Sequence, residues 1–134
     1  MTITESFIDF LETKGIATFG QDLFLRRVPS SLDTLDSVYW IIPNGGFPLG
    51  RNKTGEMMKQ YSFLIYFRST KAEDVEQKLF ALEEMLNCES CVALTGYEVT
   101  GVEVSSFSTD SDIDAENREQ GMLQVNINIY KQGC

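Results

Sequence analysis

Residues 121–130 have the sequence GMLQVNINIY, in which apolar and polar side chains alternate. Successive side chains of a strand point to opposite faces of its sheet, so the alternation separates two sets of residues. One face would carry Leu123, Val125, Ile127 and Ile129, and the other Gln124, Asn126, Asn128 and Tyr130. The stretch therefore predicts a strand with one buried face and one face that is polar but uncharged.

Four further stretches upstream predict strands. Residues 61–68 are largely apolar on both faces, which is typical of a strand in the middle of a sheet. Residues 97–107 predict another long strand, with a bulge or bend at Gly101. Shorter strands are expected at Asp22–Arg27 and Ser37–Ile42.

Two segments predict amphipathic helices. Thr2 and Glu5 have the spacing of a capping box, and Gly15 provides a stop for the first helix. Thr70 and Glu73 have the same spacing before the second. Apolar residues recur along one face of each helix, at Ile3, Phe7, Phe10 and Leu11 and at Val75, Leu79, Leu82 and Leu86.

These elements predict an α+β fold in one domain over residues 1–134. We expect a four- to five-stranded, mostly antiparallel sheet with both amphipathic helices packed on one face. Residues 43–60 hold four glycines and separate two strands, so they predict an extended hairpin loop that forms a long arm. Residues 108–120 predict an acidic loop.

The composition argues against several functions. The formal net charge of −9 disfavours binding to polyanions such as nucleic acids. The absence of histidine excludes Ser-His-Asp and Cys-His catalysis and imidazole metal sites, and we expect no enzyme activity. Residues 1–14 lack the pattern of a secretory signal, and no apolar run could cross a bilayer, so we expect a soluble protein made in a cytoplasm, with no membrane partner.

Three local motifs have part of the spacing of known sites, and none predicts a cofactor. Cys88 and Cys91 have CxxC spacing but follow a predicted helix, where the dipole disfavours a thiolate, so free turn cysteines in a reducing compartment are expected. Gly45–Gly50 lacks the lysine and the helix of a phosphate loop. Asp110, Asp112 and Asp114 open like a calcium loop but lack its glycine and its glutamate, which leaves a solvated acidic loop or weak divalent binding.

Charge is distributed unevenly along the chain. Residues 43–68 hold four basic residues against one acid, and residues 108–120 hold five acids against one base. The two segments are either solvated loops or the complementary sides of a subunit contact, as in a head-to-tail ring. The candidate interface residues are Arg51, Lys53, Lys59, Asp110, Asp112, Asp114 and Glu116.

Several stretches together resemble a known family. They are Trp40 leading into Gly45-Gly46, the strand YSFLIYFRS at 61–69 running into a helix that ends at Leu86-Asn87, LTGYEV at 94–99, DIDAENR at 112–118, and a last strand closing at Tyr130. The pattern resembles the tail terminator, or minor capsid, proteins of long-tailed bacteriophages. The likeness extends over nearly the whole chain.

The resemblance implies an α+β fold, a homo-hexameric ring and no enzyme activity. It implies a ring that caps the head-proximal end of the tail tube, stops tube polymerisation and offers a surface for joining the head. The implied partners are copies of the chain itself, the tail tube protein and a head-completion or connector protein. DNA would pass through the ring without specific binding, which the acidic charge also favours.

Two other functions stay open at this point. One is a small cellular regulatory or ligand-binding α+β module, a monomer or dimer with a pocket between helix and sheet. The other is a hydrolase with paired carboxylates, although no two acids can be placed across a cleft from the sequence. Solution mass, measured with and without tail tube protein, separates a ring from these alternatives.

Overall fold

The computed structural model describes residues 2–28, 37–51, 57–69, 71–88, 92–110 and 119–131. Helices and strands follow the predicted order of one helix, three strands, one helix and two strands. They are α1 (Ile3–Thr13), β1 (Leu23–Leu25), β2 (Val38–Arg51), β3 (Met57–Ser69), α2 (Ala72–Asn87), β4 (Tyr97–Asp110) and β5 (Glu119–Lys131).

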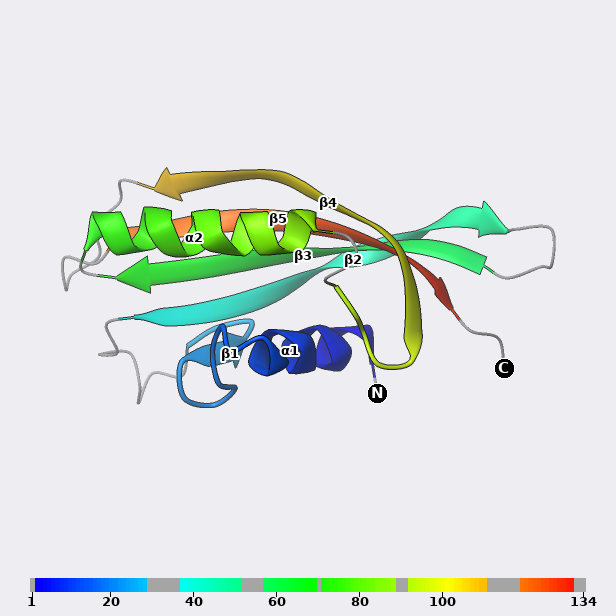
Figure 1. The fold of residues 1–134 in the computed structure, drawn as a ribbon, viewed down its shortest axis with the longest axis horizontal. Helices are drawn as coiled ribbons and strands as arrows, with labels where there is room; N and C mark the ends of the chain where they lie inside the picture. The colour runs from blue at the N-terminus through cyan, green and yellow to red at the C-terminus, as the bar shows by residue number, and fades with distance from the viewer. Residues whose placement is uncertain are drawn as a thin grey trace.

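The strands form one sheet in the order β1-β2-β3-β5-β4 (Figure 1). Pairing is antiparallel at β2–β3, β3–β5 and β4–β5 and parallel at β1–β2. β3 lies at the centre, as expected from its two largely apolar faces. The α+β prediction with a mostly antiparallel sheet is confirmed.

Both helices cover the same face of the sheet. The Phe7 ring of α1 lies 4.6 Å, centroid to centroid, from the Phe63 ring of β3. The predicted apolar faces are buried, including Phe7, Phe10 and Leu11 of α1, Val75, Leu79, Leu82 and Leu86 of α2, and Leu123, Val125, Ile127 and Ile129 of β5. These side chains belong to one core cluster, so the strand periodicity of residues 121–130 and both helical stripes were predicted correctly.

The two helices begin differently. At α1 the Thr2 hydroxyl accepts a hydrogen bond from the Glu5 N–H at 3.1 Å, which confirms the predicted cap. At α2 the N-cap residue is Lys71, whose side chain makes no capping hydrogen bond, so the predicted capping box was wrong. The helix begins at Ala72, so the N-cap position falls on Lys71 and not on the predicted Thr70. Thr70 itself lies outside the described ranges.

The arm exists, but as paired strands. The ladder between β2 and β3 extends from Val38↔Arg68 to Arg51↔Met57, so the described part of the predicted loop, 43–51 and 57–60, is strand. Register shifts at Pro43/Gly46 and Pro48/Gly50 let the pairing continue past two prolines, which cannot donate to a ladder. Figure 1 shows this arm projecting beyond the rest of the sheet.

The acidic loop is also shorter than predicted. β4 continues to Asp110 and β5 begins at Glu119, with Asp110 paired to Gln120, while residues 111–118 lie outside the described ranges. Cross-strand pairing extended the strands into polar sequence that has little strand propensity of its own. The bulge predicted at Gly101 is confirmed by a register shift between Val99 and Gly101.

Cys88 directly follows α2 and is disulfide-bonded, contrary to the expectation of free thiols. The other cysteines, Cys91 and Cys134, lie outside the described residues. The expectation rested on the absence of a multi-disulfide framework, and that absence does not exclude a single bond. Neither α1 nor α2 has both the length and the hydropathy of a membrane-spanning helix.

Candidate assembly surface

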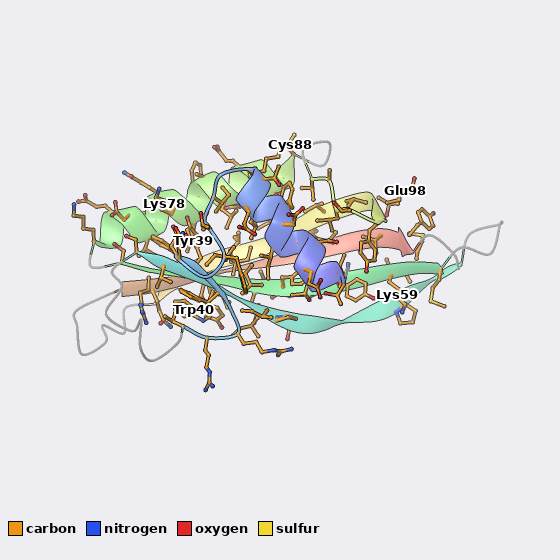
Figure 2. All side chains as sticks on the ribbon, turned by 90° about the horizontal axis from the view of Figure 1, so that it is seen from below. Tyr39, Trp40, Lys59, Lys78, Cys88 and Glu98 are labelled. Carbon is orange, nitrogen blue, oxygen red and sulfur yellow. The ribbon has the colours of Figure 1, made fainter. Side chains whose placement is uncertain are left out.

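One face of the sheet has no helix over it in the described part of the chain. Alternate side chains of β2, β3 and β5 point to this open face, and they are half-buried, whereas their neighbours on the helix face are buried. Tyr39 and Trp40, adjacent in β2, illustrate the division between the two faces (Figure 2). The open face carries Trp40, Ile42, Gln60, Ser62, Leu64, Tyr66, Met122, Gln124, Asn126 and Asn128.

An aromatic pair marks one end of the open face. Trp40 and Tyr66 are cross-strand partners, and their rings stack with centroids 5.1 Å apart and planes 4° apart. The Arg68 guanidinium carbon lies 5.8 Å from the centre of the Trp40 ring, within the range of a cation–π contact. Apart from Arg68, the side chains next to this pair on the open face are the apolar Ile42, Leu64 and Met122.

Uncharged polar side chains occupy the centre of the open face. Gln60 donates to Asn128 Oδ1 at 2.9 Å, and Ser62 donates to Asn126 Oδ1 at 2.5 Å, each across the β3–β5 ladder. The Gln124 amide donates to Asn126 Oδ1 at a longer 3.5 Å. Because amide and hydroxyl side chains carry no charge, the centre of the face is neutral in a protein of net charge −9.

The sequence identified half of this network. The alternation in residues 121–130 singled out Gln124, Asn126 and Asn128, but it gave no indication of their partners. Gln60 was assigned to the arm and Ser62 to an apolar strand, so their polar side chains had no visible role. Only the register between β3 and β5 brings the two halves together.

The predicted interface residues lie at opposite ends of the sheet. Arg51 pairs with Met57 at the far end of the arm, and Lys59 pairs with Pro48 a little nearer the body. Asp110 ends β4 beside Gln120, level with the Ser69 end of β3. Lys53, Asp112, Asp114 and Glu116 lie outside the described residues.

This separation is large. The 13 residues of β3 between the two ends span roughly 40 Å at about 3.3 Å per residue. Arg51 and Asp110 of one copy therefore cannot touch. A contact between the basic arm and the acidic end of the hairpin would have to join two copies of the chain.

Both outer edges of the sheet contain features that limit uncontrolled pairing. Among the described residues, β1 covers the outer edge of β2 at Tyr39–Ile41, and the continuing edge contains Pro43 and Pro48. β4, the opposite edge, is bulged at two places. Prolines and bulges prevent an edge from acting as a flat template for further strands. Such edges favour side-chain docking over indiscriminate strand addition.

The described residues contain no group of three or more potential metal ligands. The calcium-like acids Asp112 and Asp114 lie outside those residues. Two surface hollows lie over the helices, one over α1 and one over α2.

No known protein family and no curated protein matches the sequence. Among solved structures, a chain from the virion of a native gene transfer agent (GTA) particle matches with a TM-score of 0.65, over 96% of this chain and 98% of that one. The two chains share one fold. At 9% identity the likeness concerns the fold alone. It agrees with the expectation of a virion protein, but it does not show membership of the tail terminator family.

Proposed function

We propose that this protein is a virion structural subunit of the tail terminator type. The observation that supports the proposal best is the likeness to the GTA virion chain, which covers both chains almost end to end. The protein would form a homo-hexameric ring that caps the head-proximal end of the tail tube and stops tube polymerisation. The ring would then provide the surface that joins head and tail.

The charge geometry supports a head-to-tail ring. In such a ring each copy offers different surfaces to its two neighbours. Arg51, Lys53 and Lys59 of one arm would meet Asp110, Asp112, Asp114 and Glu116 of the next copy, since the two groups belong to opposite ends of the molecule. Complementary charge of this kind sets register and partner choice more than affinity.

The neutral centre of the open face suits a protein that does not retain DNA. Amide and hydroxyl side chains there offer no cation to phosphate, and the net charge of −9 repels it. DNA would pass through the ring without specific binding. The other partners would be the tail tube protein and a head-completion or connector protein, with assembly in the host cytoplasm and no catalytic step.

The test is the solution mass of the purified protein by light scattering, alone and with tail tube protein. A mass near six times the 15.1 kDa of one chain, or rings at tube ends in electron micrographs, is expected. A monomer under both conditions would contradict the proposal and favour the ligand-binding module.

The arm contact has its own test. Lys53→Glu with Lys59→Glu should weaken ring formation in a salt-sensitive way, because charge pairing at an exposed contact is screened by salt. Lys78→Glu, on an exposed residue of α2, is the control for the single variant Lys59→Glu, because it makes the same charge change away from the arm (Figure 2). An oligomer unaffected by the Lys53 and Lys59 double variant would remove the pairing.

A further inference from the structure

The hollow over α1 has an apolar floor. Ile8, Phe19 and Leu25 line it, and the last two keep 48% and 37% of their surfaces exposed. The Phe19 N–H donates to the Glu12 carboxylate at 3.4 Å, which holds the Phe19 segment against α1. Large apolar side chains gathered in an open hollow mark a site where another surface can dock.

The rim of this hollow is acidic. Glu5, Asp9 and Glu12 line it, at spacings of four and three residues along one side of α1. No basic side chain lines it within the described ranges. The hollow therefore favours an occupant that combines an apolar side chain with a cation.

The arm has that combination. Leu49 is 42% exposed and follows Pro48, the cross-strand partner of Lys59. Beyond Lys59 towards the end of the arm the sequence adds Arg51 and Lys53. Within the described residues, the other strongly exposed large apolar side chain outside the α1 hollow is Phe80 of α2.

The arm cannot reach the hollow of its own copy. The β2–β3 ladder holds it extended to Arg51↔Met57, and Figure 1 shows it leading away from α1 and β1. We propose that Leu49 of one copy seats against Phe19 and Leu25 of the next, with Lys59 over Asp9 and Glu12. The inference rests on the proposed ring and revises its arm contact: Lys59 meets the α1 hollow, while Arg51 and Lys53 keep the acidic segment of the neighbour as their partner.

The test uses analytical ultracentrifugation of the full chain at low salt. It measures the protein concentration at which half of the chains are assembled, and compares that concentration between the wild type and the variants. Leu49→Ser, and separately Asp9→Lys with Glu12→Lys, should each raise that concentration about tenfold, equal to about 1.4 kcal/mol. Glu76→Lys with Glu84→Lys on α2 makes the same charge change elsewhere and should leave assembly unchanged. Adding Lys59→Glu to the Asp9 and Glu12 double variant should restore assembly.

Circular dichroism checks that each variant is folded. If the Asp9→Lys and Glu12→Lys variant is unfolded, Asp9→Asn with Glu12→Gln takes its place. Normal assembly of folded hollow variants, or an equal loss in the α2 control, would overturn the inference and leave the ring intact. A wild-type chain that never assembles would refute the ring and the inference together.

Discussion

Trp40 and Tyr66 stack on the open face of the sheet, with ring planes 4° apart and centroids separated by 5.1 Å. They are Cα partners in the β2–β3 ladder, and Trp40 is the single tryptophan of the chain. The stack lies near the start of β2, at the end of the β2–β3 ladder opposite the arm, where β1 and β5 also pair with these strands.

A double-mutant cycle should detect this contact. Trp40→Ala and Tyr66→Ala should show a coupling of about 1 kcal/mol in the free energy of unfolding, because stacked aromatic pairs stabilise beyond their buried area. Urea titration followed by circular dichroism measures it. The control pair Tyr66→Ala and Phe80→Ala, on the sheet and on an exposed side of α2, should be additive. Additivity within about 0.3 kcal/mol for the stacked pair would contradict the prediction.

Neighbouring residues of α2 should respond oppositely to truncation. Leu79 is fully buried and Phe80 is 52% exposed. Leu79→Ala should lower the free energy of unfolding by about 2–5 kcal/mol through lost burial and a residual cavity, whereas Phe80→Ala should change it by less than about 0.5 kcal/mol. Chemical denaturation of the two variants measures both values. Comparable losses would contradict the orientation of α2, in which Leu79 faces the sheet and Phe80 faces solvent.

The arm should be sensitive to a methyl group at Gly46. A Cβ there would lie 2.7 Å from Tyr61 Cδ1 and 3.0 Å from the Gln60 carbonyl oxygen. Gly46→Ala should therefore cost about 1–3 kcal/mol and speed amide exchange in residues 57–61. Gly101→Ala is the matched control, since its Cβ would approach nothing closer than 3.5 Å. Unchanged exchange in the arm of Gly46→Ala would argue against the register of the ladder.

Stability should fall at alkaline pH because of Tyr39. Burial, and then the nearby Asp22 carboxylate, raise the pKa of Tyr39 from 10.0 to about 12. Between those values the unfolded chain loses the phenol proton while the folded chain keeps it, so the free energy of unfolding decreases as the pH rises. The loss should total about 2 kcal/mol between pH 10 and 12. Phenylalanine cannot ionise, so the free energy of unfolding of Tyr39→Phe should fall by about 2 kcal/mol less than that of the wild type over this range. Urea titrations at a series of pH values measure the difference, and equal pH dependence in the two proteins would refute the raised pKa of Tyr39.

The sequence predicted elements well where side chains alone decide them. Leu123, Val125 and Ile127 had to be buried on one face, and Leu79 and Leu82 on one side of a helix, because any other arrangement leaves large apolar groups in water. The loops at 43–60 and 108–120 were predicted too long. Their extra strand pairing depends on a partner strand, which local composition does not reveal.

The assembly surface was predictable only in part. The charge segregation was visible in the sequence, but the distance between Arg51 and Asp110 required the register of three strands. The acidic hollow was not visible at all, because Phe19 and Leu25 come to α1 through a turn whose course no periodicity specifies. Surfaces built from different elements need the topology as well as the pattern.

The order β1-β2-β3-β5-β4 also determines how the chain must fold. β2 with β3, and β4 with β5, are hairpins of neighbouring strands that can form within microseconds. The central seam, from Met58↔Tyr130 to Ser69↔Glu119, joins them across a large sequence separation and carries the entropy cost of closing that loop. We therefore expect docking of the two hairpins to be the slow step of folding. Until it occurs, β3 and β5 would lack their central partner, and one copy could exchange a hairpin with another.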